Sequence, residues 1–240
     1  MLAPLLFTLR RRDTVAERTM AFHFDKPAGF QFLAGQSVDL TLLTPPETDA
    51  EGDIRTFTIA SSPRDDEIVI ATRLRDTAFK RVLTSVPLGT EVKAEGPAGS
   101  FTLHQDARIP AVFLTGGIGI TPFRSMIREA AATDAAREMW LFYSNNRPED
   151  AAFLDELQHL ADTRPWLHFV PTMTGMATSQ RPWHGETRLI DGEMVSRRLS
   201  MFGPTYYVAG PPAMVKAMLA MLTSGHVADR DIRTDEFAGY

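Results

Sequence analysis

The pattern of apolar residues changes once along the chain, near Ile109, and this change constrains the fold more than any single motif. Before it, short segments alternate polar and apolar residues and are separated by turns rich in proline and glycine. Such segments are typical of β-strands with one buried face. They lie at residues 19–24, 37–43, 56–60, 67–74 and 91–95, and a helical segment lies at 77–85. Many short strands at this spacing favour an antiparallel β-barrel, which leaves no sheet edge exposed.

After Ile109, continuous apolar runs alternate with helical stretches, which is typical of βαβ units around a parallel sheet. The runs lie at residues 111–114, 139–143, 167–170 and 206–209, and the helical stretches at 123–132, 151–161, 194–199 and 213–222. We therefore expect an antiparallel β-barrel domain at residues 1–107, followed by a doubly wound α/β domain with a parallel sheet at residues 108–240.

Composition excludes several classes of chemistry. The chain contains no cysteine, so disulfides, thiolate nucleophiles and cysteine-ligated iron–sulfur clusters cannot be built on it. The formal net charge of -5 offers no basic surface for a phosphate backbone, so nucleic acid is not an expected partner. The histidines lack paired metal-ligand spacing and no Gly-x-Ser-x-Gly motif is present, so neither a metal site nor a nucleophilic hydrolase is expected.

The sequence carries no targeting pattern that we recognise. The apolar start at residues 1–7 is followed by Arg10, Arg11 and Arg12, which reverses the order of a secretory signal. The longest apolar run, at residues 111–120, has about half of the ~20 residues that a membrane span needs. We expect a cytoplasmic protein with no membrane association, and a monomer.

A glycine-rich loop, Thr115 to Pro122, follows the first apolar run of the second half and reads Thr-Gly-Gly-Ile-Gly-Ile-Thr-Pro. It opens a helix, for which Thr121 is the expected N-cap and Pro122 the first helical residue. The unpaired N–H groups and positive dipole of a helix start suit a dinucleotide pyrophosphate. The loop is not a Rossmann fingerprint, because Pro122 stands where the third glycine would be.

A second informative segment, Arg55 to Ser61, reads Arg-Thr-Phe-Thr-Ile-Ala-Ser. In a strand, Phe57 would face one way and Thr58 the other. Arg55 at the strand start could then reach a phosphate with its planar guanidinium. Taken alone, the segment is better explained as an ordinary strand with an exposed arginine.

These two segments occur in a fixed order with Gly96-Pro97-Ala98-Gly99-Ser100-Phe101, with Ala209-Gly210-Pro211-Pro212 and with an aromatic at Tyr240. In this combination the chain resembles the ferredoxin–NADP reductase superfamily over nearly its whole length. The resemblance implies a barrel that binds FAD and an α/β domain that binds NAD(P)H, with no iron–sulfur domain.

The resemblance also implies roles for individual residues around the flavin. Arg55 would bind the pyrophosphate, Phe57 would pack on the isoalloxazine, and the Thr58 hydroxyl would bond flavin N5. Tyr240 would stack on the opposite face of the ring, so Thr58 and Tyr240 are the expected catalytic residues. The full set of expected FAD-binding residues is Arg55, Thr56, Phe57, Thr58, Thr72, Arg73, Leu74, Phe79, Lys80, Gly99, Ser100 and Tyr240.

For NAD(P)H, the resemblance implies a site across the glycine-rich loop, with the nicotinamide near Gly210. The expected residues are Thr115, Gly116, Gly117, Gly119, Ile120, Thr121, Pro122, Ser144, Asn145, Arg147, Thr174, Gly210, Pro211 and Met214. The choice between NADH and NADPH stays open. Gly175 lacks the guanidinium that NADP-specific relatives carry, whereas Arg147, Arg181 and Arg188 lie nearby in sequence.

The expected activity is that of a flavin-dependent NAD(P)H oxidoreductase. Since no cluster can be built on this chain, electrons would pass to a separate acceptor such as ferredoxin, flavodoxin or a similar small redox protein. Two alternatives remain: an NAD(P)H:flavin reductase that releases reduced flavin, and a non-catalytic flavin electron-transfer subunit.

Overall fold

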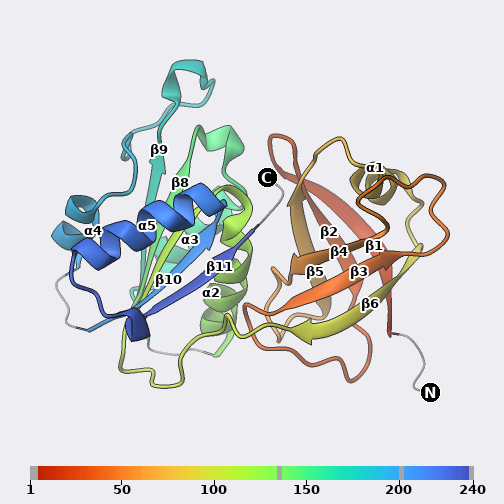
Figure 1. Cartoon of the computed structure of the whole chain (residues 1–240), viewed down its shortest axis with the longest axis horizontal. Coiled ribbons are helices and arrows are strands. Elements are labelled where there is room, and N and C mark those ends of the chain that lie inside the picture. The colour runs from red at the N-terminus through yellow and green to blue at the C-terminus, as the bar shows by residue number, and fades with distance from the viewer. Residues whose placement is uncertain (1–4, 134–136, 200–202, 238–240) are drawn as a thin grey trace.

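The computed structural model describes residues 5–133, 137–199 and 203–237 and divides them between two sheets (Figure 1). The first half contains β1 (Leu5–Ala16), β2 (Thr19–Asp25), β3 (Ser37–Leu42), β4 (Ile54–Thr58), β5 (Glu67–Arg73), α1 (Ala78–Ser85) and β6 (Glu91–Ala98). The second half contains β7 (Ala111–Gly116), η1 (Gly117–Ile120), α2 (Thr121–Thr133), β8 (Met139–Asn145), η2 (Pro148–Asp150), α3 (Leu154–Thr163), β9 (Leu167–Met173), η3 (Met176–Thr178), α4 (Gly192–Arg198), β10 (Thr205–Gly210), α5 (Pro212–Ser224), η4 (Asp229–Asp231) and β11 (Ile232–Glu236).

The first six strands form an antiparallel sheet in the order β4-β3-β6-β1-β2-β5. Its two outer strands meet again just beyond β4, where Ile59 pairs with Ile70 and the Ala60 N–H donates to the Val69 carbonyl at 2.7 Å. The predicted barrel is thus confirmed. Its interior holds a cluster of buried phenylalanines with aliphatic residues, among them Phe7, Phe22, Phe24, Phe57 and Phe79.

Strand β1 was not predicted, because its three consecutive arginines obscure the alternation. Phe7 and Leu9 are fully buried on one face, and the arginines that follow are bonded outside the core. Arg12 donates to the carbonyls of Leu83 and Val86, which are among the last carbonyls of α1. Residues 5–16 therefore form a barrel strand whose arginines satisfy polar groups around it.

The second sheet is parallel throughout, in the order β11-β10-β7-β8-β9. Alternate residues of its central strands pack on opposite layers: Phe113 and Leu141 face α2 and α3, whereas Val112 and Phe142 face α4 and α5. The predicted doubly wound α/β architecture is confirmed. Strand β11 was missed, because Ile232 is its one strongly apolar residue.

Helix α2 packs directly against the barrel. The Arg124 guanidinium donates to the Ala60 carbonyl at 2.7 Å and pairs with Glu156 at 2.8 Å, and the Ser125 hydroxyl donates to the Ser61 carbonyl at 2.6 Å. One apolar cluster also contains residues of both halves, including Val69 from the barrel and Met126 from α2. The two sheets are therefore joined by a packed interface. The proposed domain boundary, at residue 108, lies in the segment between β6 and β7.

Candidate active site

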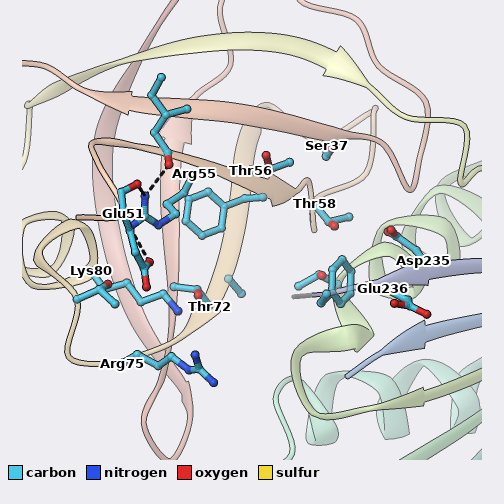
Figure 2. A pocket seen from close by; sticks show the side chains of 16 residues that line it. Ser37, Glu51, Arg55, Thr56, Thr58, Thr72, Arg75, Lys80, Asp235 and Glu236 are labelled. Carbon is cyan, nitrogen blue, oxygen red and sulfur yellow. Dashed lines mark hydrogen bonds and ion pairs between the residues drawn. The ribbon is translucent and has the colours of Figure 1, made fainter. Parts of the chain in front are cut away.

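A cavity of about 510 Å³ lies between the barrel and the carboxyl end of β11; we term it the interdomain cavity. Figure 2 shows barrel residues on one side of it and Asp235 and Glu236 on the other. Its lining residues are Ser37, Glu51, Ile54, Arg55, Thr56, Phe57, Thr58, Ala71, Thr72, Arg75, Thr77, Lys80, Thr121, Asp235, Glu236 and Phe237. Six of the residues expected to bind FAD are among them: Arg55, Thr56, Phe57, Thr58, Thr72 and Lys80.

The other described residues expected around the flavin are not among those that line the cavity. Phe79 is buried behind the wall, where its ring centroid lies 5.8 Å from that of Phe57 and 5.4 Å from the Arg55 guanidinium carbon. Leu74, Gly99 and Ser100 do not line the cavity, and Arg73 lines a different one. Tyr240 lies outside the described residues.

The wall formed by the second domain is acidic, which the sequence did not indicate. Asp235 and Glu236 end strand β11, and burial raises the pKa of the Asp235 carboxyl above its ordinary value. Thr58 faces the same cavity from the barrel and is buried. The cavity therefore places a hydroxyl and carboxyl groups around an enclosed space between the two sheets.

A second cavity, of about 480 Å³, lies at the carboxyl ends of β7, β8, β9 and β10; we term it the sheet-edge cavity. Its lining residues are Arg73, Gly116, Gly117, Ser144, Asn145, Asn146, Asp150, Thr174, Leu189, Ile190, Asp191, Pro211, Met214, Ala217, Met218 and Met221. Seven of the residues expected to bind NAD(P)H are among them: Gly116, Gly117, Ser144, Asn145, Thr174, Pro211 and Met214. The carboxyl edge of a parallel sheet is where ligands bind in open α/β folds.

The glycine-rich loop enters its helix earlier than predicted. A 3-10 turn over Gly117–Ile120 precedes α2 without a break, and Gly116 is its N-cap. Thr121 is helical and its hydroxyl donates to the Ile118 carbonyl, so the prediction of Thr121 as N-cap is wrong. The reason is that Gly117, at φ +56°, turns the chain into the helix four residues before the threonine.

Several loop residues hold the turn in place without lining the sheet-edge cavity. The Thr115 hydroxyl donates to the Ala209 carbonyl at 2.8 Å, and Ile120 and Pro122 are buried. A Cβ on Gly119 would lie 2.6 Å from the Ala209 oxygen, so only glycine permits this approach of the loop to β10. Gly210, at φ +151°, lies beside Gly116 but is not among the lining residues.

Three arginines that the sequence suggested as ligands for a nucleotide phosphate are paired with carboxylates in the structure. Arg147 binds both oxygens of Asp150 at 2.9 Å and also Glu17 at 2.6 Å. Arg181 pairs with Asp155 at 3.0 Å, and Arg188 with Glu193 at 3.0 Å. None of the three lines the sheet-edge cavity.

Two buried polar atoms have no hydrogen-bond partner in the described part of the chain and belong to residues that line these cavities. They are the Thr77 hydroxyl, at the interdomain cavity, and the Asn145 side-chain nitrogen, at the sheet-edge cavity. Buried polar groups are normally satisfied, so each indicates a missing partner. The cavities, their orphaned polar atoms and the helix start at Gly117 fit two ligands that carry phosphate groups.

No helix within residues 5–133, 137–199 or 203–237 is long and apolar enough to cross a membrane.

Residues 113–219 match the family model described as the oxidoreductase NAD-binding domain. The reductase component of propane 2-monooxygenase from Rhodococcus jostii is 30% identical over 217 residues, which are 88% of this chain and 57% of that one. Ferredoxin–NADP reductase B of Sorangium cellulosum is 35% identical over 149 residues, 60% of this chain and 58% of that one. The chain therefore spans less than two thirds of the length of these relatives.

Among solved structures, a ferredoxin NADP+ reductase from Neisseria gonorrhoeae with bound FAD and NADP aligns with a TM-score of 0.79 at 18% identity. The alignment covers 97% of this chain and 98% of that one, so it shows a shared fold over both sheets. The barrel, the parallel sheet and the ordered motifs agree with these matches, which support the predicted resemblance to the ferredoxin–NADP reductase superfamily.

Proposed function

We propose that the chain is a flavin-dependent NAD(P)H reductase, with FAD in the interdomain cavity and the nicotinamide nucleotide in the sheet-edge cavity. One observation carries the proposal: consecutive residues of one strand end line both cavities. Thr72 lines the interdomain cavity and Arg73 lines the sheet-edge cavity. In the glycine-rich loop, Gly117 lines the sheet-edge cavity and Thr121 lines the interdomain cavity. Ligands in the two cavities would therefore meet, which hydride transfer requires.

The residues of the chain would bind and orient the two ligands. Phe57, backed by Phe79, offers an apolar wall for the ring system, and Thr58 offers a hydroxyl close to it. Gly116 and Gly117 bring the helix start within reach of a pyrophosphate. A bound flavin supplies the ability to accept a hydride and to release its electrons singly. Tyr240 remains the proposed cover of the ring.

The acceptor is proposed to be a separate redox protein. The chain has no cysteine with which to ligate a cluster, and the relatives include reductase components of monooxygenases and a ferredoxin–NADP reductase. The chain covers less than two thirds of the length of these relatives. A small ferredoxin, a flavodoxin or an oxygenase component fits the proposal as the acceptor.

Purified protein tests this function directly. We expect FAD to remain bound through desalting and its absorbance near 450 nm, a region typical of oxidised flavin, to bleach anaerobically when NADH or NADPH is added. An intact, flavin-loaded protein that neither nucleotide reduces would contradict the reductase and favour the non-catalytic subunit. Loss of the flavin on desalting, with turnover of added free flavin, would favour the flavin reductase.

We further infer that NADH is preferred over NADPH. The nicotinamide has to reach the interdomain cavity near Arg73, so the adenosine half would lie at the opposite end, beside Leu189, Asp191 and Met221. Of the described residues lining this cavity, Arg73 is the one cation, and Asp150 and Asp191 are anions. A 2′-phosphate would thus meet carboxylates whose arginine partners, Arg147 and Arg188, lie outside the lining, whereas ribose hydroxyls can donate to these carboxylates.

The preference is tested by the ratio of kcat/KM for NADH to that for NADPH, which we expect to be about tenfold or more. Asp191→Asn should lower this ratio, because the amide removes the charge but still accepts the Met194 N–H that Asp191 receives at 2.7 Å. Asp155→Asn is the matched control, since Asp155 is exposed and lies outside the cavity. A native enzyme that favours NADPH would contradict the inference.

A further inference from the structure

Three methionines gather on one side of the sheet-edge cavity. Met214, Met218 and Met221 share one face of helix α5, and all three line the cavity. The chain contains no cysteine, so methionine thioethers are the only sulfur atoms in it that an oxidant can attack. The space in which a nucleotide is proposed to bind therefore contains groups that are sensitive to oxidation.

Met214 is the member of this group that lies against the glycine-rich loop. A Cβ on Gly116 would lie 2.7 Å from the Met214 sulfur, and a Cβ on Gly210 would lie 3.5 Å from it. The thioether thus fills the space beside these two glycines, and the side of the sulfur that faces Gly116 is closed. Gly116 is also the residue that leads into the continuous helix of η1 and α2, whose start is proposed to bind the pyrophosphate.

The Met214 side chain is accessible, which oxidation requires. Met214 and Met221 are partly exposed, whereas Met126 and Met194 are fully buried. Hydrogen peroxide oxidises a thioether by adding one oxygen atom to the sulfur, and the peroxide is itself reduced to water. The product, methionine sulfoxide, is polar and carries an acceptor oxygen where the thioether was apolar.

We propose that Met214 is an oxidation site through which hydrogen peroxide switches off nucleotide binding. Because the side of the sulfur toward Gly116 is closed, the added oxygen would project into the cavity beside the unpaired N–H groups of the helix start. There it competes with a pyrophosphate for the same donors. A bound nucleotide, in turn, shields the sulfur from peroxide.

The inference rests on the proposed function, since it requires a nicotinamide nucleotide in the sheet-edge cavity. A flavoprotein reductase that lacks its acceptor can reduce dioxygen to hydrogen peroxide. Oxidation of Met214 would then lower the supply of electrons under the condition in which they are diverted to dioxygen.

Peptide mass mapping of the flavin-loaded protein in hydrogen peroxide tests access and shielding without turnover. Met214 should gain one oxygen about tenfold or more faster than Met194. Saturating NAD+ should slow the oxidation of Met214 about fivefold or more. Met20, which is partly exposed and lines neither cavity, is the internal control and should oxidise at the same rate with and without NAD+. Equal rates at Met214 with and without NAD+, in protein that binds NAD+, would overturn the proposal.

Calorimetric titration with NAD+ before and after peroxide measures the effect on binding. The native protein should lose affinity about tenfold or more, and methionine sulfoxide reductase, which removes the oxygen, should restore it. Met214→Leu keeps an apolar side chain of similar volume without the sulfur, so its affinities before and after peroxide should agree within about twofold. Met221→Leu is the matched control on the same helix and should stay as sensitive as the native protein.

Two results would overturn the inference and leave the reductase proposal standing. One is equal sensitivity to peroxide in Met214→Leu and the native protein. The other is unchanged affinity for NAD+ after complete oxidation of Met214. A native chain that binds no nicotinamide nucleotide would contradict the proposed function and this inference together.

Discussion

At the scale of single residues, the interdomain cavity places two buried barrel threonines, Thr58 and Thr72, opposite acidic side chains from the other sheet. Thr58 was predicted to lie at this site from the motif that begins at Arg55. Asp235 and Glu236 were not predicted, because two consecutive acidic residues are normally solvent-exposed. Asp235 shares the lining of this cavity with barrel residues more than a hundred positions away in the sequence. No local pattern carries that information.

Thr58→Val tests the hydroxyl at this scale. The substitution keeps the shape of the side chain and removes the hydroxyl that is proposed to bond the flavin, so the rate of flavin bleaching by saturating nucleotide should fall by roughly tenfold or more. Stopped-flow absorbance measures the rate. Thr56→Val is the control, because the Thr56 hydroxyl lines the same cavity but is bonded to Asp39. Equal rates in Thr58→Val and the native protein would remove Thr58 from the catalytic residues.

The pH dependence of flavin binding is a second prediction at residue scale. Lys80 lines the interdomain cavity and is among the residues expected to bind FAD. It is protonated below its pKa of about 8 and loses its charge above it, so the affinity for the anionic FAD should fall as pH rises through that range. A bound phosphate raises this pKa, which moves the fall to higher pH in the complex. In Lys80→Gln this fall in FAD affinity should be absent, as fluorescence titrations at several pH values would reveal.

At the scale of elements, helix α2 starts with Thr121 at the interdomain cavity and also joins the two sheets. Arg124 is 7% exposed and lies 4.3 Å above the Phe153 ring, in addition to its bonds with Ala60 and Glu156. Burial lowers the pKa of its guanidinium, and its carboxylate partner opposes that shift. The helix itself was predicted from its apolar spacing, whereas the use of its arginines against the barrel was not.

Arg124→Met should therefore destabilise the protein by about 1–3 kcal/mol, because it leaves the buried Ala60 carbonyl without this donor and removes one of the two arginines that pair with Glu156. Urea denaturation measures the free energy of unfolding. Arg64→Met is the control at the same interface: Arg64 pairs with Glu129 but its side chain is 60% exposed, so we expect a loss below about 1 kcal/mol. Similar losses in both variants would contradict the importance of burial.

Gly119→Ala tests the contact between η1 and β10. The added Cβ would meet the Ala209 oxygen at 2.6 Å and the Gly210 Cα at 2.7 Å, and both atoms are backbone. We expect a loss of stability of about 1–3 kcal/mol and weaker nucleotide binding, because the loop must move. Gly192→Ala, whose Cβ would have its nearest contact at 3.7 Å, should change neither. Native nucleotide affinity in Gly119→Ala would show that the loop position is not required.

At the scale of the whole molecule, the alternation of polar and apolar residues and the later apolar runs were sufficient to predict a barrel followed by a doubly wound sheet. The order of the strands depends on pairing between segments that are distant in the sequence. The same holds for β1 and β11, the two strands that were not predicted. The same limit applies to the cavities. Residues within motifs, such as Gly117 and Thr58, were identified, whereas Leu189 and Asp191 lie in an irregular segment with no motif.

Because a packed interface joins the halves, we expect them to unfold together. Trp140, Trp166 and Trp183 all lie in the α/β half, so their fluorescence reports on that half, and release of bound flavin reports on the barrel. Heating should give coincident midpoints for the two signals, as a single cooperative transition requires. Two separate midpoints would mean that the interface does not couple the domains.

The tip of β5 gives the molecule a lasting constraint. Thr72 and Arg73 are neighbours in the chain, yet Thr72 lines the interdomain cavity and Arg73 lines the sheet-edge cavity. A shift of this strand end that improved the fit of a molecule in one cavity would also move part of the wall of the other cavity. A change in the preferred electron donor would consequently require compensating changes in how the chain binds its flavin.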